Sequence, residues 1–422
     1  MPLLRHPLPA QAGCTYPPAL KGPPTLASTQ PANQPCAAGN VTFCKFAAPA
    51  ARHNFTGTNG AAPWQRLDTC GPTLPLSKPS RRSLIIAPAT VTESVLTQPL
   101  LALLRRSDPL GRIDVVAQPE LAPLFTAMAE ADDVIETGIA NERIAWLGRL
   151  ALARSIRSRS YDCAFVLQEN RTAAIAPWLA RIPVRIGAGG GVTFGMINRH
   201  VVSPHGRGKS IADRFLSMAS APGDNRPPGI PTPQLAAPPP MTEALARHLN
   251  LDTSRQLILL CPFSELGPTS EWPVRHYAEL AALITLQWPE LTVGLIGRAL
   301  DRPAGTQIAL LSGERLHNWC GRLDTSQTLA LMNHAAAVVT SESQYMHLAA
   351  ALGRPHVALY GAGDPRAERI NASRRSVMWL HLECSPCLDA HCRFGHMNCV
   401  TQQLPVQVFA SLRKAMRFSA TA

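Results

Sequence analysis

The amino-acid sequence predicts an α/β protein made of two doubly wound domains, each built on a parallel sheet. Apolar, β-branched runs alternate with helical segments along most of the chain, which is typical of parallel sheets covered by helices. A proline-rich stretch, residues 226–240, interrupts this alternation and indicates an interdomain linker. Residues 336–365 then read as strand, polar turn, helix and strand, which is a βαβ unit.

Residues 1–80 differ from the rest of the chain. They hold 14 of the 39 prolines, six Lys or Arg residues and one acidic residue, without sustained periodicity. Such a composition cannot bury enough apolar surface to fold. We therefore expect a disordered Pro/Ala-rich extension here.

The first domain is predicted over residues 81–225. Its strands are expected at 83–88, 112–117, 161–167 and 184–187, and its helices at 94–105, 119–128 and 141–158. The last of these helices carries four arginines beside an apolar side. It is amphipathic and basic, and a solvated face or a membrane-surface role would both explain it.

The second domain is predicted over residues 241–400, followed by a C-terminal helix within 401–422. Its strands are expected at 256–262, 291–297, 336–340 and 356–360, and its helices at 273–286, 326–335, 345–352 and 404–417. Pro273 opens one of these helices, where the missing N–H costs nothing.

The stretch 336–365 is the strongest candidate for a ligand site. Ser341, Glu342 and Ser343 are short polar residues suited to the start of a helix, directly after a buried strand. Ligands of parallel sheets bind beyond the carboxyl ends of the strands. The free N–H groups of a helix start there suit a phosphate.

Composition narrows the class of protein. Hydrophobic content of 46% with 16% charged residues argues against wholesale disorder. No apolar run is long enough to span a bilayer, and the N-terminus lacks the pattern of a secretory signal. The net charge of +12 favours an anionic partner: a nucleotide, a nucleic acid or an anionic membrane surface.

Four of the eleven cysteines form a cluster, Cys384, Cys387, Cys392 and Cys399. Four thiols within sixteen residues, with turn formers between them, have the spacing of metal ligands. We expect a closed structural zinc or iron site, with two local disulfides as the alternative. Its place after the last strand of the sheet argues against a catalytic role for the metal.

Several motifs of the second domain resemble a known family. The order P-F-S-E-x-G-P-x-x-x-W-P, L-x-G-x-x-x-D, G-x-L-D-x-x-Q and V-V-T-x-x-S-x-x-M-H-x-A-A-A-L-x-R-P is similar to glycosyltransferase family 9, the ADP-heptose:lipopolysaccharide heptosyltransferases. The resemblance extends from about Ser83 to the C-terminal helix. It implies a GT-B fold, in which two Rossmann-like domains face a cleft.

The resemblance also implies a reaction. Heptose would pass from ADP-heptose to the lipopolysaccharide inner core with inversion and without an obligatory metal or other cofactor. The family's base, an Asp, corresponds to Glu93 here. Its alternative role is that of an acid at a helix start, favoured by the helix dipole.

Donor binding is implied for residues of three strand-end loops. They are Ser264, Glu265, Ser270, Gly297, Glu342, Ser343, Gln344, Met346 and His347. Ser343, Met346 and His347 match the family motif, whereas Glu342 and Gln344 replace its Asp and Gly. The loop before Trp272 also lacks the family's Lys.

The acceptor implied by the family is the lipid A-core, held through basic groups of the first domain. Arg171, Arg185 and Arg214 are the candidates, each also interpretable as a surface arginine. The expected location is cytoplasmic, with peripheral contact to the inner membrane.

Other functions remain open at this point. The chain could be a heptosyltransferase acting on protein hydroxyls, or a paralogue that binds without turnover because its site residues are altered. A nucleic-acid binder is disfavoured, because basic and aromatic residues do not interleave.

Overall fold

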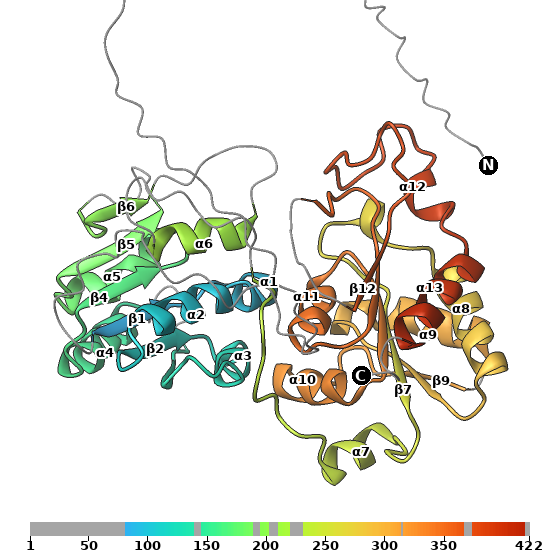
Figure 1. Ribbon diagram of the computed structural model, residues 1–422, viewed down its shortest axis with the longest axis horizontal. Coiled ribbons are helices and arrows are strands. Elements are labelled where there is room, and N and C mark those ends of the chain that lie inside the picture. The colour runs from blue at the N-terminus through green and yellow to red at the C-terminus, as the bar shows by residue number, and fades with distance from the viewer. Residues whose placement is uncertain are drawn as a thin grey trace, which may run out of the picture. The chain divides into compact units, whose positions relative to one another are not determined.

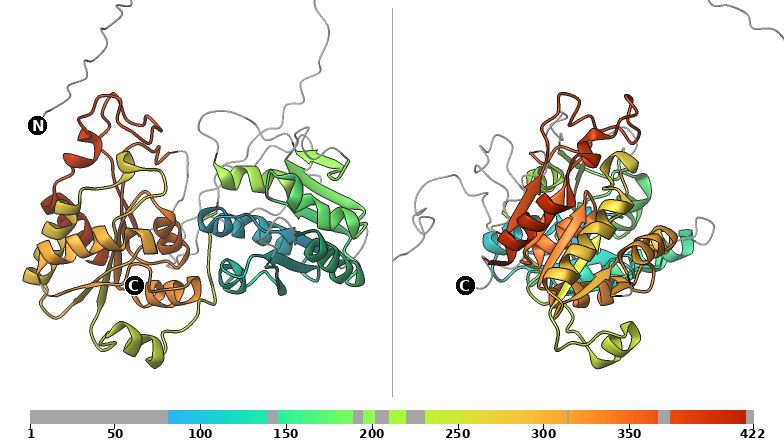
Figure 2. Two further views of the ribbon diagram at one scale, coloured as in Figure 1. Left: turned by 180° about the vertical axis from the view of Figure 1, so that it is seen from behind. Right: turned by 90° about the vertical axis from the view of Figure 1, so that its right-hand side faces the viewer.

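Two sheets of six parallel strands organise the chain. In the computed structural model described here, residues 81–138, 145–188, 195–201, 210–219, 231–313, 315–366 and 374–417 are described. The predicted extension over 1–80 and the first five residues of the linker, 226–230, lie outside these residues. Figures 1 and 2 show helices on both faces of each sheet. The α/β fold with two doubly wound domains is confirmed.

The first sheet has the strand order β3-β2-β1-β4-β5-β6. Its strands are β1 Arg82–Ile86, β2 Arg112–Ala117, β3 Asp133–Glu136, β4 Cys163–Val166, β5 Val184–Ala188 and β6 Arg199–Val201. The helices of this part of the chain are α1 Val91–Val95, α2 Gln98–Ser107, α3 Ala122–Thr126, α4 Ala145–Ser158, α5 Arg171–Leu179 and α6 Ile211–Ala219.

The second sheet repeats this topology with the order β12-β11-β10-β7-β8-β9. Its strands are β7 Leu257–Cys261, β8 Thr292–Leu295, β9 Leu316–Asn318, β10 Ala337–Ser341, β11 His356–Leu359 and β12 Arg375–Met378. Its helices are α7 Glu243–Leu249, α8 Val274–Gln287, α9 Arg302–Ser312, α10 Thr325–His334, α11 Gln344–Ala351, α12 Asn398–Thr401 and α13 Pro405–Arg417.

Both faces of each sheet are buried, which explains the continuous apolar runs. In β1, Ile85 packs into one hydrophobic cluster while Leu84 and Ile86 pack into another on the opposite face. In β7, Leu257 and Leu259 separate from Ile258 and Leu260 in the same way. Strands covered on both faces lose the apolar-polar alternation of half-exposed strands.

The predicted helix over residues 94–105 is two helices instead. Helix α1 ends at Val95 and α2 begins at Gln98, with Pro99 in its first turn. A proline cannot donate the N–H that a continuous helix would need at this place. The break turns Glu93 into a residue of a separate, short helix that directly follows β1.

The described part of the linker, residues 231–240, contains no helix or strand. Its backbone nevertheless makes defined contacts within this part of the chain: the N–H of Leu235 donates to Ala351 O at 2.9 Å, and that of Ala237 to Ala127 O at 3.1 Å. Helix α13 buries Val408 and Leu412 in the core of the second domain. None of the described helices is long and apolar enough to cross a membrane.

Candidate functional site

The strand orders locate the ligand edge of each domain. In both sheets the order reverses between the first and fourth strands, β1 and β4 or β7 and β10. At such a reversal the connecting loops diverge, which leaves a crevice beyond the carboxyl ends of the two strands. The segment with Glu93 follows β1, and the segments with Ser264 and Glu342 follow β7 and β10. Most of the predicted site residues therefore lie at these two edges.

Each carboxylate oxygen of Glu93 accepts a hydrogen bond. It is the third residue of α1, and its N–H donates to Thr90 Oγ1 at 3.2 Å, which caps the helix. The Thr90 hydroxyl in turn donates to Glu93 Oε2 at 3.2 Å. Arg214 Nη2 donates to Glu93 Oε1 at 3.0 Å, and the Glu93 side chain is still 26% exposed. The carboxylate is thus oriented and remains open to solvent on one side.

Arg214 joins two carboxylates. Besides Glu93, it binds Glu169 Oε1 through Nη1 at 2.6 Å, and its guanidinium lies over the Phe215 ring. Glu169 belongs to the loop after β4, so Arg214 of α6 ties the loops that follow β1 and β4 to each other. Its predicted contact with the acceptor stays a prediction. The structure adds a contact that the sequence does not predict, with the candidate base itself.

Of the other two predicted arginines, the structure describes the side chain of Arg185 but not that of Arg171. Arg185 donates through its side chain to the backbone oxygens of Ile182 and Met196. Burial lowers the pKa of this guanidinium from its ordinary value. These contacts favour a structural role for Arg185, while its acceptor contact stays a prediction. Arg171 begins α5 at the carboxyl edge of β4, and its side chain lies outside the described residues.

Glu342 is buried and accepts hydrogen bonds from three donors within the described part of the chain. Only 1% of the residue is exposed. Oε1 accepts from the N–H groups of Gly361 and Gly363 at 2.8 and 2.9 Å. Oε2 accepts from the Ser270 hydroxyl at 2.6 Å. The carboxylate therefore fastens together the loops that follow β7, β10 and β11, and it acts as a support of the edge.

Two glycines make room for this arrangement. A Cβ on Gly363 would lie 2.6 Å from Glu342 Oε2, and a Cβ on Gly361 would lie 2.1 Å from Thr269 O. Both distances are far below van der Waals contact. Close approach of the backbone is therefore required at these positions, as glycine alone allows.

Ser343 caps helix α11. Its hydroxyl accepts from the Tyr345 N–H at 3.4 Å and pairs with the Thr340 hydroxyl at 3.0 Å. Gln344 is the first residue of the helix and is half-buried. Met346 and His347 are 4% and 3% exposed, and Met346 packs with Tyr360. Among these predicted donor residues, Ser343 and Gln344 are therefore the ones at the helix start, and the other two lie inside.

The loop after β7 presents one buried and one exposed candidate. The Ser264 hydroxyl donates to Glu342 O at 2.5 Å and is 4% exposed. Glu265 beside it is exposed. Gly297, after β8, is half-buried, and a Cβ there would lie 3.0 Å from the Phe263 ring.

Arg298 is a cation of this edge that the sequence prediction omits. Its guanidinium binds Asp301 with two hydrogen bonds of 3.0 Å, and its side chain is 35% exposed. The bond to Asp301 raises the pKa of Arg298, and Glu265 contributes to the same shift. Arg298 thus lies near the loop after β7, where the family's Lys is missing. In the sequence, the position of Arg298 directly after the predicted site residue Gly297 is the feature that indicates it.

A small cavity lies at the carboxyl edge of the first sheet. Its volume is about 100 Å³, enough for one phosphate or carboxylate group. Its polar lining comes from strand ends and helices: Gln118, Thr137, Arg149, Gln168 and Thr172. These residues are absent from the prediction, although Gln118 and Gln168 directly follow predicted strands.

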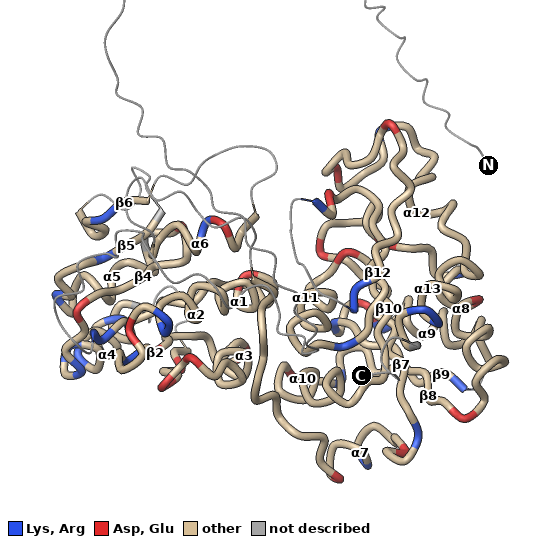
Figure 3. The backbone as a smooth tube through the Cα atoms, in the orientation of Figure 1, with Lys and Arg blue, Asp and Glu red and all other residues tan. Residues whose placement is uncertain are grey.

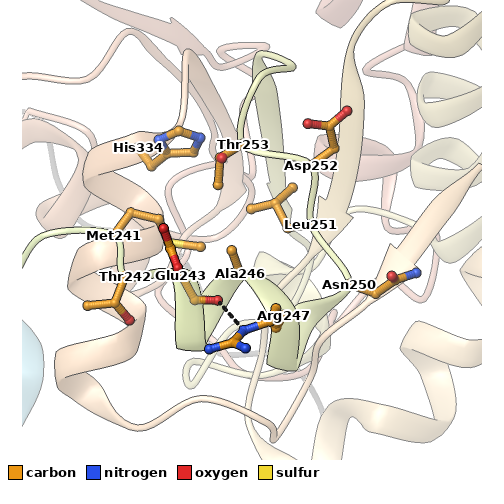
Figure 4. A pocket seen from close by; sticks show the side chains of 10 residues that line it. All are labelled: Met241, Thr242, Glu243, Ala246, Arg247, Asn250, Leu251, Asp252, Thr253 and His334. Carbon is orange, nitrogen blue, oxygen red and sulfur yellow. Dashed lines mark hydrogen bonds between the residues drawn. The ribbon is translucent and has the colours of Figure 1, made fainter.

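A cavity of about 650 Å³ lies elsewhere, beside α7 and the end of α10. Its charged lining is mixed, with Glu243, Arg247, Asp252 and His334. In Figure 4 the carboxylate of Asp252 and the guanidinium of Arg247 lie on opposite sides of it. Polar groups that diverge in this way do not specify one ligand, so the carboxyl edges remain the candidate site.

The four clustered cysteines carry free thiols. Cys384, Cys387 and Cys392 are half-buried and Cys399 is buried. Burial, followed by the influence of the three other thiols, raises the pKa of the Cys399 thiol to about 11, so the four lie close enough to interact. Among the described residues, however, no three His, Cys, Asp or Glu side chains are arranged to hold a metal ion.

Comparison with known proteins covers most of the chain. The family model described as glycosyltransferase family 9 (heptosyltransferase) matches residues 149–398. Lipopolysaccharide heptosyltransferase 2 of Salmonella typhimurium is 32% identical over 291 residues, covering 67% of this chain and 83% of the relative. Lipooligosaccharide heptosyltransferase 2 of Haemophilus influenzae is 30% identical over 295 residues, covering 67% and 84%.

Solved structures of heptosyltransferases also match the fold of this chain. The ADP-heptose lipopolysaccharide heptosyltransferase II of Escherichia coli matches with a TM-score of 0.67 at 28% identity, over 80% of this chain and 99% of that chain. A heptosyltransferase of Escherichia coli solved with ADP matches with a TM-score of 0.60 at 19% identity, over 79% and 99%, a likeness of fold alone. Glu93 precedes the residues that the family model matches.

The contacts of Glu342 lead to a prediction about stability. Glu342→Ala should lower the free energy of unfolding by about 3 kcal/mol, because two buried N–H groups and a hydroxyl lose their acceptor. Urea unfolding measures this, with exposed Glu265→Ala as the control, expected within about 0.5 kcal/mol of the native chain. Equal unfolding midpoints for the two variants would contradict the supporting role of Glu342.

Proposed function

Because the chain belongs to glycosyltransferase family 9, the heptosyltransferases, we propose that it transfers heptose from ADP-heptose to the inner core of lipopolysaccharide. The observation that carries the proposal is the match of the family model to residues 149–398 of a chain that has a ligand edge in each of two Rossmann-like domains. Relatives named for this transfer are 30–32% identical over two thirds of the chain.

Helices α1 and α11 are in contact. Helix α1, which holds Glu93, packs against α11, which begins beside Ser343. Leu96 at the end of α1 and Ala350 of α11 share a small hydrophobic cluster with Ala212 of α6. Helix α1 with the proposed base and helix α11 are therefore neighbours, and the shared cluster lies at the end of α11 that is away from Ser343.

The proposed reaction is a single displacement with inversion. The oxygen of an acceptor hydroxyl attacks the anomeric carbon of the heptose while the Glu93 carboxylate takes the hydroxyl proton. The bond from that carbon to the β-phosphate oxygen breaks, and its electron pair leaves with ADP. The step as written uses no metal ion.

The surrounding groups support this assignment. Arg214 and the Thr90 hydroxyl each hold one oxygen of Glu93, so the carboxylate does not need to reorganise before it accepts the proton. On the donor side, the start of α11 offers N–H groups, and Arg298 offers a positive charge near the loop after β7. Such donors stabilise the negative charge that develops on the departing diphosphate.

The proposed acceptor is the lipid A-core, with the first domain as its binding half. The 100 Å³ cavity with Arg149 is suited to one anionic group of such an acceptor.

A second candidate function is a paralogue that binds ADP-heptose without efficient turnover. The interior positions of Met346 and His347 and the supporting role of Glu342 favour it. An acceptor hydroxyl on a protein would fit the same chemistry.

We also propose that the four clustered cysteines hold one structural zinc or iron ion. Four thiols are the donors that these metals prefer, and the mutual influence of the thiols on the pKa of Cys399 places them near one another. Metal binding would require the thiols to move closer to one another, because the described residues include no group of three or more ligands that could hold a metal ion.

Helix α4 is the proposed membrane contact. It carries Arg149, Arg154 and Arg157 and no acidic residue, and Figure 3 shows positive residues around it. Trp146 and Leu147 are 54% and 70% exposed. Leu147 and Arg154 are seven residues apart and so lie on one face. An exposed face with large apolar and basic residues fits an anionic membrane surface. This would place the enzyme at the cytoplasmic side of the inner membrane.

Glu93 is tested by turnover. Glu93→Gln should lower kcat for ADP release from ADP-heptose and purified acceptor by about 10²- to 10⁴-fold, because the proton loses its base. Exposed Glu120→Gln is the control and should keep native activity. Equal turnover in Glu93→Gln would refute the base and leave the enzyme intact. A native chain that binds ADP in calorimetry without releasing it from ADP-heptose would support the binding-only paralogue.

The cysteine site is tested by metal analysis. The purified chain should contain about one equivalent of zinc or iron, and Cys384→Ser should contain none, because one ligand of four is lost. Cys163→Ala, which removes a buried thiol of β4, should keep the metal. Two disulfides in the non-reduced mass, with no bound metal, would contradict the proposal.

Membrane contact is tested with vesicles that contain an anionic phospholipid. Replacing Trp146 and Leu147 together by Ser should weaken co-sedimentation about tenfold or more, since each apolar side chain contributes roughly 1.5–3 kcal/mol when buried. The matched control replaces Leu310 and Leu311, which are 80% and 57% exposed in the second domain. Equal weakening by both pairs would exclude α4 as the specific contact.

A further inference from the structure

A second group of positive charges lies at the opposite edge of the second sheet. Arg354 belongs to the turn that leads into β11, and Arg374 directly precedes β12. The two strands are parallel neighbours, with His356 paired to Arg375 in register. The two arginines therefore stand side by side at the amino ends of their strands, away from the carboxyl edge with Ser343.

Both arginines line one cavity of about 500 Å³. One wall is the linker segment 232–236, and another is the end of α11 with the turn after it, residues 350–353. None of the described residues that line this cavity is acidic. Its size is within the range of small-molecule sites in proteins.

The positive charge in this cavity has little compensation. Arg354 Nε donates to Leu352 O at 3.2 Å, so part of its charge meets the carbonyl end of α11. No ion pair of Arg354 or Arg374 with a carboxylate occurs among the described residues. Burial, and then the charge of Arg374, lowers the pKa of Arg354. Two guanidinium groups that repel each other in a half-buried cavity favour an anion between them.

We propose that this cavity binds a small soluble anion with two linked phosphate groups, held by Arg354 and Arg374. The planar guanidinium fork pairs with phosphate oxygens through two parallel hydrogen bonds. Two such forks in one cavity suit a diphosphate better than a single phosphate. This site is distinct from the donor edge, because the two are at opposite ends of α11.

The site would connect the linker to the second domain. The N–H of Leu235 already donates to Ala351 O, so the linker wall is fastened to the end of α11. An anion between the arginines would brace the wall that the linker forms. The eight residues of α11 span about 12 Å. Binding of an anion at the end of α11 would therefore affect a helix whose start, after Ser343, lies about 12 Å away.

The experiment is calorimetric titration of the full chain with inorganic pyrophosphate at constant ionic strength. Arg374→Gln should bind pyrophosphate roughly tenfold or more weakly, because one charge-assisted contact is lost. Arg354→Gln should show the same loss, and Arg106→Gln, an exposed arginine of α2, should bind as the native chain does. Inorganic phosphate should bind the native chain at least several-fold more weakly than pyrophosphate.

The Arg374→Gln variant should fold as the native chain does, so a loss of binding in it reports the cavity and not misfolding. The side chain of Arg374 makes no polar contact within the described part of the chain, whereas that of Arg354 does. Pyrophosphate bound at the donor edge would be common to all variants, so the difference between variants reports this cavity alone. Equal binding by the native chain and Arg374→Gln, or phosphate binding as tightly as pyrophosphate, would overturn the proposal.

Discussion

A carboxylate that is 1% exposed must have its negative charge balanced by nearby donors, and Glu342 has two backbone N–H groups and a hydroxyl for this purpose. Hydrogen bonds to an ionised group are among the stronger ones in proteins. They join the loops after β7, β10 and β11, so the start of α11 and the Gly361–Gly363 turn keep fixed positions. Whatever binds at this edge meets a surface that is already organised.

The same constraint explains the composition of the surrounding loops. Gly361 and Gly363 approach so closely that a side chain on either would overlap Thr269 or Glu342. Glu342 has one methylene more than the Asp of the family motif, and this length lets it reach the short side chain of Ser270. The altered residues are therefore complementary to one another. Their change affects how the edge is supported. The positive charge near the loop after β7 comes from Arg298.

Much of the fold follows from local sequence, because central strands have long apolar runs. The unpredicted strands are β3, β6, β9 and β12, which are the edge strands of the two sheets. They are short and partly exposed, so no apolar run marks them. Strand ends predict the two edges at which the candidate site lies, but they do not predict the direction of side chains. In α11 every residue from Tyr345 to Ala351 is buried, so periodicity could not separate Met346 and His347 from ligand-facing positions. The contact between Arg214 and Glu93 joins residues 121 apart in sequence, which no local pattern predicts.

The short edge strands also affect how the protein behaves at high concentration. Each of the four has only three or four residues, and β3 begins and ends with an acidic side chain. An unpaired strand edge is a template on which another chain can add, and brief, charged edges give such a strand few hydrogen bonds. The two large sheets therefore resist edge-to-edge polymerisation, a useful property for a chain whose central strands are continuous apolar runs.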